Sequence, residues 1–307
     1  MQACANVNGI ITPYSEAKIS ISDRGFLYVD SIYEVTRTYS GVLFYAVEHF
    51  ERLENSARLA HMQISQSREF LQKEILKTVQ ATKPQRSEDI FIRYTITRGD
   101  GPLDLDPATA KKTSYIILVK EIPRWNPKFF SAGVTLAIPR TRRNSPLALD
   151  PNIKSGNYLN NILAVAEARE LGADDALLLS AEGKLTEASN SNVSFVIKGE
   201  VHSPLHEPQT ATGNLRGITK KIMEKLCTNS GIRYVERAML PQDISLASEA
   251  IVSSATREVM PVAEILLENG MKKIFSAADR KITAILQAEY KKYVAAYIQQ
   301  HANEAYF

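Results

Sequence analysis

A proline- and aromatic-rich stretch at residues 123–130 interrupts the hydrophobic pattern of this 307-residue chain and divides it in two. On each side, runs with the alternating pattern of β-strands lie between segments with the spacing of amphipathic helices. This arrangement predicts an α/β protein. We place an α+β small domain at residues 1–121, an interdomain loop at 122–132 and a larger α/β domain at 133–307. The aromatic side chains of the loop either pack locally or close over a substrate.

The hydrophobic pattern predicts individual elements in both domains. In the first domain, strands are expected at 10–13, 31–39, 42–45, 90–97 and 114–119, with helices beginning near Glu48 and Ser67. In the second domain, a strand is expected at 134–138, a helix between Lys154 and Leu171, and a long amphipathic helix at 277–307.

Lys154 and Glu187 form the residue pair with the most specific chemistry. Lys154 stands in a loop just before a helical pattern, and Glu187 lies in a small, polar run between two strand-like segments. A lysine can bind an aldehyde as a Schiff base, and an acid can face the nitrogen of a pyridinium ring. Together they meet the requirement of pyridoxal phosphate chemistry, although each alone could be an ordinary surface residue.

Three further segments could bind the phosphate of such a cofactor. Arg52 lies on an expected helix, and Gly217 precedes another helix whose first N–H groups would attract an anion. The third segment is a turn of small residues at 253–256, which follows the apolar run at 250–252. In isolation, Arg52 could equally pair with Glu48 or Glu51 on its own helix.

The order of these motifs resembles that of the fold-type IV pyridoxal-phosphate enzymes. This class contains branched-chain aminotransferases, D-amino-acid aminotransferases, (R)-amine transaminases and aminodeoxychorismate lyases, and the similarity runs from about Gly9 to Val262. The segments that carry it are 22–26 (Ser-Asp-Arg-Gly-Phe), 48–53 (Glu-His-x-x-Arg-Leu), 154–159 (Lys-Ser-x-Asn-Tyr-Leu), 172–176 (Gly-Ala-Asp-Asp-Ala), 186–192 (Thr-Glu-Ala-Ser-x-x-Asn), 217–219 (Gly-Ile-Thr) and 258–262 (Glu-Val-x-Pro-Val). The resemblance implies the fold of this class and pyridoxal 5′-phosphate as the cofactor.

The resemblance also implies roles for individual residues. Lys154 would carry the cofactor and move the proton of the substrate α-carbon. Glu187 would face the pyridine nitrogen, Tyr158 would bind the phenolic oxygen, and Arg52 would bind the phosphate. The other cofactor-binding residues implied are Asn192, Leu215, Gly217, Ile218, Thr219, Ser254, Ala255 and Thr256. No metal site is expected.

Two positions depart from the pattern of the class. Relatives often have proline where Arg216 stands, and branched-chain enzymes often have a phosphate-contacting threonine where Ala255 stands. The backbone N–H donors are expected to remain at both places. At the second place, a hydroxyl group would come from Ser254 or Thr256 or be absent.

Substrate contacts are expected from two strands and one loop. The residues concerned are Tyr33, Val35, Arg37, Phe91, Arg93, Arg98 and Leu103. An arginine binds both oxygens of a carboxylate, so Arg37 or Arg93 is expected to face the pocket; pairing with Glu34 or Asp89 is the alternative. Val35 stands where branched-chain relatives have glycine and resembles the D-amino-acid and (R)-amine enzymes. The loop at 97–107 instead resembles branched-chain relatives.

The resulting prediction is a branched-chain-like aminotransferase that moves an amino group from an amino acid to 2-oxoglutarate or pyruvate. A D-amino-acid or (R)-amine transaminase is the alternative, and an aminodeoxychorismate lyase is less favoured. A catalytically silent binding protein on the same fold is disfavoured because Lys154 and Glu187 are both present.

Composition and charge argue against other classes. The net charge of +3 is nearly neutral, and the basic run at 140–143 lacks interleaved aromatic residues, so no nucleic-acid partner is expected. We expect no membrane span and no signal peptide, and the two cysteines suggest neither a disulfide framework nor a metal cluster. A cytoplasmic protein is therefore expected. The family resemblance implies a homodimer with shared active sites, in which the loop at 99–106 completes the neighbour's pocket.

Overall fold

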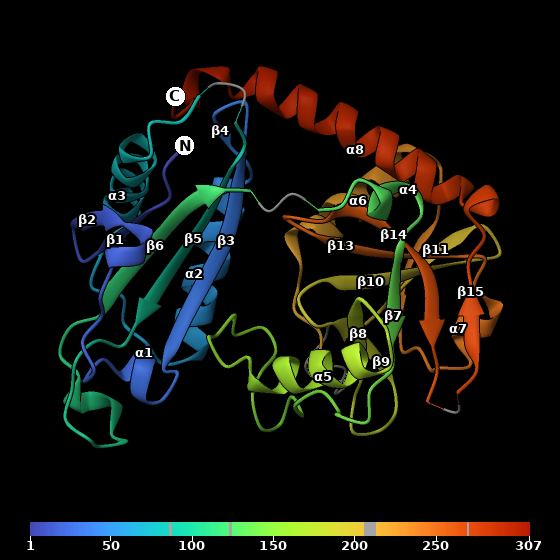
Figure 1. Ribbon diagram of the computed structural model, residues 1–307, viewed down its shortest axis with the longest axis horizontal. Helices are drawn as coiled ribbons and strands as arrows, with labels where there is room; N and C mark the ends of the chain where they lie inside the picture. Colours follow the sequence, from blue (N-terminus) through green and yellow to red (C-terminus); the bar gives the residue numbers. More distant parts are fainter. Residues whose placement is uncertain (86–87, 123–124, 206–212, 269) are drawn as a thin grey trace. The chain divides into compact units, whose positions relative to one another are not determined.

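The chain folds into two compact units, each with its own sheet (Figure 1). The computed structural model describes residues 1–85, 88–122, 125–205, 213–268 and 270–307. Unit 1 consists of Met1–Pro123, Ile153–Asn157 and Val294–Phe307, and unit 2 of Arg124–Asn152 and Tyr158–Tyr293. Residues 123 and 124 of the expected loop at 122–132 lie outside the described residues. Helices and sheets are mixed in the chain, which confirms the α/β class.

Unit 1 contains a six-stranded antiparallel sheet in the order β2-β1-β6-β5-β3-β4. Its strands are β1 (Cys4–Val7), β2 (Ile10–Pro13), β3 (Ser31–Tyr39), β4 (Val42–Leu43), β5 (Ile90–Thr97) and β6 (Ser114–Glu121). Its helices are η1 (Tyr14–Glu16), α1 (Arg24–Leu27), α2 (Ala46–Leu59), α3 (Arg68–Ala81) and η2 (Pro107–Thr109). β4 is shorter than expected because Tyr45 takes a left-handed conformation, with φ 57°, and α2 begins directly after it.

The two faces of this sheet have different surroundings. Ile90, Ile92 and Ile96 of β5 are buried in a core with Phe50 of α2 and Ile75 of α3. Since side chains alternate along a strand, the intervening residues of β5 and their partners on β3 lie on the opposite face. The register places these residues opposite one another as Tyr33↔Thr95, Val35↔Arg93 and Arg37↔Phe91. Five of the expected substrate residues therefore share one face of the sheet.

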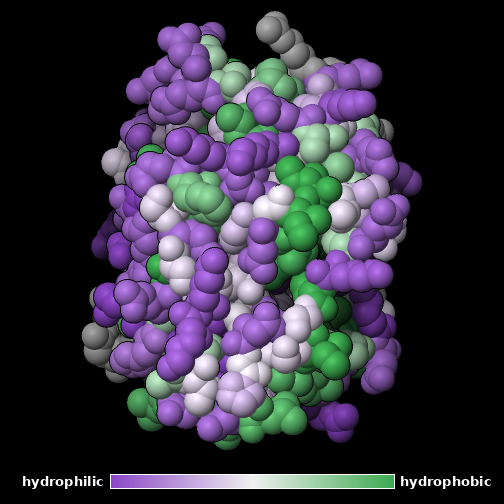
Figure 2. All heavy atoms as spheres, turned by 90° about the vertical axis from the view of Figure 1, so that its left-hand side faces the viewer, coloured by the Kyte–Doolittle hydropathy of each residue, from purple (hydrophilic) through white to green (hydrophobic). Residues whose placement is uncertain are grey.

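The surface of unit 1 is mostly hydrophilic. Figure 2 shows the face on which unit 1 is drawn toward the viewer, with a stripe of hydrophobic residues among the hydrophilic ones. The large exposed apolar side chains of unit 1 include Ile10, Tyr14, Ile19, Ile21, Phe26, Val29, Leu103 and Leu105. Leu103 and Leu105 belong to the loop expected to reach a neighbouring subunit.

Unit 2 contains a nine-stranded mixed sheet in the order β12-β11-β10-β13-β14-β7-β8-β9, with β15 paired to β14. Its strands are β7 (Val134–Ala137), β8 (Asp175–Leu179), β9 (Leu185–Ala188), β10 (Asn192–Ile197), β11 (Glu200–Pro204), β12 (Tyr234–Arg237), β13 (Glu249–Ser254), β14 (Glu258–Leu266) and β15 (Lys272–Ile274). Its helices include α4 (Lys128–Ser131), α5 (Leu159–Glu170), α6 (Ile218–Asn229) and α7 (Asp243–Leu246). β8, β9 and β10 are buried along their whole lengths, as strands covered on both faces are.

The aromatic residues of the connecting stretch pack within unit 2. Trp125 and Phe129 lie against its main core, and the indole N–H of Trp125 donates to the Thr256 carbonyl at 3.0 Å. The guanidinium of Arg257 lies 4.8 Å from the Trp125 ring. These contacts match the local-packing interpretation of the stretch.

The C-terminal segment is less continuous than expected. The single helix expected at 277–307 is instead α8 (Lys281–Gln300), with the short helices η4 (Ala277–Asp279) before it and η5 (Ala302–Glu304) after it. Leu286 and Tyr290 of α8 are buried, whereas Ile285 is exposed. Within the described ranges, the helices are all too short or too polar to cross a bilayer.

Candidate active site

Lys154 is held by its backbone against β3 of unit 1. The Tyr33 N–H donates to the Lys154 carbonyl at 2.9 Å, and the Lys154 N–H donates to Ser56 Oγ of α2 at 3.1 Å. Position 156 favours glycine, because a Cβ on Gly156 would lie 2.5 Å from Ser31 Oγ. The loop that carries Lys154 is therefore fixed to a strand that is distant in sequence.

The Lys154 amine contacts the aromatic ring of Tyr33, which Arg93 also contacts. Lys154 Nζ is 3.4 Å from the Tyr33 hydroxyl and 4.5 Å from the centroid of the Tyr33 ring. The guanidinium carbon of Arg93 is 3.8 Å from the same centroid. Cations favour the faces of aromatic rings, so Tyr33 can hold both side chains in place. The structure thus brings together three residues expected at the site.

Arg52 pairs with a residue of β3 rather than with Glu48 or Glu51 of its own helix. Its Nε and Nη2 donate to the two carboxylate oxygens of Glu34 at 2.6 and 2.8 Å. His49 Nδ1 lies 2.7 Å from Glu34 Oε2. Burial by itself would raise the pKa of Glu34, but Arg52 and His49 outweigh it and lower that pKa to about 2. Glu34 is therefore a carboxylate.

Two other expected substrate arginines have acidic partners within unit 1. Arg37 pairs with Asp89 at 2.6 Å, which is the alternative left open for it. Arg98 pairs with Asp30 at 2.6 Å and also donates to the carbonyls of residues 60 and 61. The Leu103 side chain is exposed. Of the expected carboxylate binders, Arg93 is the one that contacts the Tyr33 ring, as Lys154 does.

Glu187 lies on β9 of unit 2, not between two strands as the sequence pattern indicated. Its side chain is buried, and both carboxylate oxygens accept hydrogen bonds. Arg143 Nη2 donates to Oε1 at 3.2 Å, and the Leu215 N–H and Asn192 Nδ2 donate to Oε2 at 3.0 and 3.3 Å. These donors satisfy a buried negative charge.

Arg143 is a site residue that the sequence did not single out. Besides Glu187, it donates to Asn161 Oδ1 of α5 at 3.1 Å and to the Gly213 carbonyl at 3.2 Å. It thereby ties together a strand, a helix and the segment that leads into α6. The basic run at 140–143 gave no reason to distinguish it from Arg140, which is exposed.

The N-terminus of α6 presents uncapped backbone donors. Gly217 occupies the cap position in an extended conformation, and no side chain of the described part of the chain caps this helix end. A Cβ on Gly217 would lie 1.9 Å from Asn192 Oδ1, so a side chain here would displace Asn192. Asn192 Nδ2 also donates to the Leu215 carbonyl at 3.0 Å. The first-turn N–H groups, at Ile218 and Thr219, are thus available to an anion.

The remaining expected cofactor residues also belong to unit 2. Ser254 ends β13, and its hydroxyl accepts from the Arg257 N–H at 3.2 Å, which closes the turn through Ala255 and Thr256. Tyr158 occupies the position just before α5 and is half-buried.

The donor set of each unit fits a part of pyridoxal 5′-phosphate. A buried, fully hydrogen-bonded carboxylate at Glu187 suits a protonated ring nitrogen, and the uncapped start of α6 suits a phosphate. In unit 1, Lys154 offers an amine and Arg52 a guanidinium. Across the described ranges, no cluster of His, Cys, Asp or Glu could hold a metal ion.

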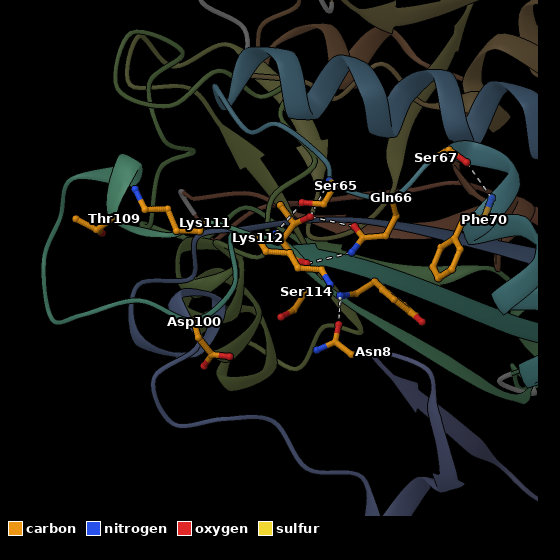
Figure 3. A pocket seen from close by; sticks show the side chains of 12 residues that line it. Asn8, Ser65, Gln66, Ser67, Phe70, Asp100, Thr109, Lys111, Lys112 and Ser114 are labelled. Atoms are coloured by element: carbon orange, nitrogen blue, oxygen red, sulfur yellow. Dashed lines mark hydrogen bonds between the residues drawn. The ribbon is translucent and has the colours of Figure 1, made fainter.

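A separate pocket of about 670 Å³ opens on unit 1 (Figure 3). Ser65, Gln66, Ser67, Phe70 and Lys112 are among the residues that line it, and hydrogen bonds join its polar side chains. None of the residues expected to bind cofactor or substrate lines this pocket. It is therefore not part of the site that contains Lys154.

Comparison with known proteins settles the family. The family model "Amino-transferase class IV" matches residues 31–265 of the chain. The chain belongs to the class IV aminotransferases. The matched range contains Lys154, Glu187 and Arg52. The predicted class, transaminase activity and pyridoxal 5′-phosphate cofactor are thereby confirmed.

Individual relatives carry two kinds of name. A protein of Methanocaldococcus jannaschii named "Putative branched-chain-amino-acid aminotransferase" is 33% identical over 259 residues, covering 84% of this chain and 86% of that protein. A D-alanine aminotransferase of Bacillus licheniformis is 31% identical over 261 residues, covering 84% of this chain and 87% of that protein. The fold is similar to that of a branched-chain aminotransferase from the archaeon Thermoproteus uzoniensis, solved with norvaline. The TM-score is 0.84 at 27% identity, covering 96% of this chain and 95% of that one.

Proposed function

We propose that this class IV transaminase takes its amino group from aliphatic, branched-chain-like amino acids and passes it to 2-oxoglutarate or pyruvate. The observation that carries this proposal is that Lys154 Nζ and the Arg93 guanidinium both contact the Tyr33 ring, at 4.5 and 3.8 Å from its centroid. An amine that moves a proton and a guanidinium that binds a carboxylate are both needed to handle an amino acid. Branched-chain names among the relatives support the choice of donor.

The chemistry divides between the cofactor and the side chains of the protein. When bound, pyridoxal 5′-phosphate withdraws electrons from the substrate and makes its α-proton acidic. Lys154 Nζ takes that proton and returns it, and Arg93 binds the substrate carboxylate. Glu187, held by Arg143 and the Leu215 N–H, supplies the negative charge for the ring nitrogen.

The remaining residues hold the cofactor and shape the substrate pocket. Arg52 and the first N–H groups of α6 bind the phosphate, and Tyr158 binds the phenolic oxygen. Val35 and Phe91 lie on the same sheet face as Arg93 and limit the size of the substrate side chain.

A D-amino-acid or (R)-amine donor is the second candidate. The D-alanine aminotransferase among the relatives and the presence of Val35 in place of glycine both favour it. A pocket narrowed by a few methyl groups discriminates between substrates by only about 1–3 kcal/mol, so Val35 alone does not decide the donor.

We also propose a cytoplasmic homodimer. Leu159, Ile162 and Leu163 of α5 form an exposed apolar face, while the small side chains of Ala164 and Ala168 are buried inside unit 2. Apolar faces of this kind mark protein contacts. Both cysteines are free and buried, in keeping with a reducing compartment. The loop at 99–106, with its exposed leucines, would complete the site of the neighbouring subunit.

Parallel donor assays test the substrate proposal. The purified holoenzyme is mixed with L-leucine, L-valine, D-alanine, D-glutamate or (R)-1-phenylethylamine, and the visible absorbance of the bound cofactor is followed. L-leucine and L-valine should bleach it, and 2-oxoglutarate or pyruvate should restore it. Activity confined to D-amino acids or the (R)-amine would overturn the branched-chain preference. Pyruvate release from aminodeoxychorismate, with no response to any amino donor, would overturn transfer itself.

Replacement of Lys154 tests its role separately. Lys154→Ala should abolish turnover and the cofactor colour that borohydride removes, because the amine is lost. Lys292→Ala is the control, since that lysine is exposed and pairs with Glu289 one turn earlier. Normal turnover in Lys154→Ala would remove the basis of the proposed mechanism.

A further inference from the structure

Glu34 is a buried acid that the proposed mechanism leaves without a role. It lies on β3 between Tyr33 and Val35, but it points to the opposite face of the sheet, toward α2. Its side chain is completely buried. A buried carboxylate is costly unless it is paired and hydrogen-bonded, so its contacts require an explanation.

The contacts of Glu34 fix the orientation of Arg52. Both carboxylate oxygens receive donors from the same guanidinium, at 2.6 and 2.8 Å, which sets the plane of the arginine fork. His49 adds a third hydrogen bond, at 2.7 Å from Nδ1 to Oε2. Because an ionised carboxylate only accepts, the proton of that bond belongs to His49. Both side-chain partners of Glu34 come from α2, so the acid ties this helix to the strand that also carries Tyr33.

We propose that Glu34 is a positioning residue that holds Arg52 in the orientation that binds the cofactor phosphate. This inference rests on the phosphate-binding role proposed above for Arg52. It assigns to β3 two tasks on its two faces: Tyr33 lies beside Lys154 on one face, and Glu34 orients the phosphate anchor on the other.

An effect of charge alone and an effect of positioning predict opposite changes in phosphate binding when Glu34 is removed. If only charge mattered, loss of a carboxylate beside Arg52 would make the surroundings more positive and strengthen phosphate binding. If Glu34 positions Arg52, its loss frees a buried guanidinium to turn toward other acceptors, and phosphate binding weakens. The sign of the change therefore distinguishes the two explanations.

The test compares a ligand that has the phosphate with one that lacks it. Dissociation constants of pyridoxal 5′-phosphate and of pyridoxal are measured by absorbance titration of the full-length apoenzyme, for the wild type, Glu34→Gln and Arg52→Ala. We expect Glu34→Gln to weaken pyridoxal 5′-phosphate binding by about tenfold or more while pyridoxal changes less than about twofold. Arg52→Ala should give the same pattern.

The matched control is Glu74→Gln, an identical change at another buried glutamate of unit 1. Glu74 bonds to Asn6, Lys77 and Tyr115, none of which belongs to the proposed site. The Glu74→Gln change should leave the dissociation constants of pyridoxal 5′-phosphate and pyridoxal unchanged. Thermal melting should show that each variant is folded.

Four outcomes would overturn the proposal, and they differ in what else they affect. Unchanged or tighter pyridoxal 5′-phosphate binding in Glu34→Gln, with Arg52→Ala still weakened, would refute positioning and leave the role of Arg52 intact. Equal weakening for both ligands, or the same loss in Glu74→Gln, would show a general structural effect. If Arg52→Ala fails to alter the preference for the phosphorylated ligand, the proposed phosphate role of Arg52 fails, and this inference with it.

Discussion

Arg143 and Glu187 form an ion pair in unit 2, with 3.2 Å between Nη2 and Oε1. The acid expected at the cofactor ring nitrogen is therefore held by an arginine that also bonds to α5 and to the segment before α6. Because hydrogen bonds to a charged group are stronger than neutral ones, this arginine holds the Glu187 carboxylate in position. The site in unit 2 is thus a connected set of polar groups.

Arg143→Met should lower kcat/KM by roughly tenfold to a hundredfold. The change removes a charge-assisted hydrogen bond to a buried carboxylate, an interaction worth about 1.5–3 kcal/mol. Steady-state kinetics at saturating cofactor measure the loss. Arg142→Met is the matched control, because Arg142 pairs with Glu268 at a partly exposed position and should change the rate less than about twofold. Equal effects of the two changes would contradict a specific role for Arg143.

Gly217→Ala should destabilise unit 2 and weaken cofactor binding. The new Cβ would lie 1.9 Å from Asn192 Oδ1, so Asn192 must move away from Glu187 and the Leu215 carbonyl. Overpacking of this kind costs about 1–3 kcal/mol of unfolding free energy. Urea unfolding measures the cost.

A double variant shows whether Asn192 is the cause. Gly217→Ala combined with Asn192→Ala should cost less than the sum of the single changes, because the clash has no partner once the amide is gone. Strict additivity would show that the backbone at Gly217, and not the contact with Asn192, is responsible.

The free energy of unfolding should fall as the pH is lowered, because of Glu34 and His49. The pKa of Glu34 is lowered from 4.5 to about 2, so its contribution is complete above pH 4.5 and is lost as the pH falls toward 2. The pKa of His49 is lowered below 6.5, chiefly by burial, so the unfolded chain takes up this proton first, and stability also falls as the pH drops below 6.5. Both groups act in the same direction.

Urea unfolding at several pH values isolates the share of Glu34. In Glu34→Gln that share is absent, so the difference in unfolding free energy between wild type and variant should shrink by about 2 kcal/mol from pH 5 to pH 3. A difference that stays constant over this range would show that Glu34 does not titrate as its contacts require.

The sequence predicted β3 and β5 to the residue because their alternation has a clear physical cause. One face of β5 packs against helices, so its apolar residues Ile90, Ile92 and Ile96 recur at every second position. The same regularity does not say what a side chain on the open face contacts. Arg37 and Arg93 share that face, yet Arg37 pairs with Asp89, 52 residues away in sequence, and Arg93 lies on Tyr33.

Helix α5 shows a second limit of sequence patterns. The spacing of Leu159, Ile162 and Leu163 predicts the helix correctly, but these side chains are exposed. Ala164 and Ala168 face the interior instead, in a buried cluster with Ala176 and Leu178 of β8. A pattern shows which residues share a helix face and does not show whether that face meets its own unit or another chain.

The exposed face of α5 leads to the prediction on assembly. Ile162→Glu should convert the proposed homodimer to monomers, because a charge buried in an apolar interface is left without a partner. Size-exclusion chromatography with light scattering measures the mass, which is 34.2 kDa for one chain.

Leu246→Glu on α7 is the matched control: Leu246 is 65% exposed and Ile162 is 60% exposed, so both changes place an acid at an apolar surface position of unit 2. The control should remain dimeric. A dimer that survives Ile162→Glu would place the interface elsewhere, and a wild-type enzyme that is active as a monomer would refute the shared-site homodimer.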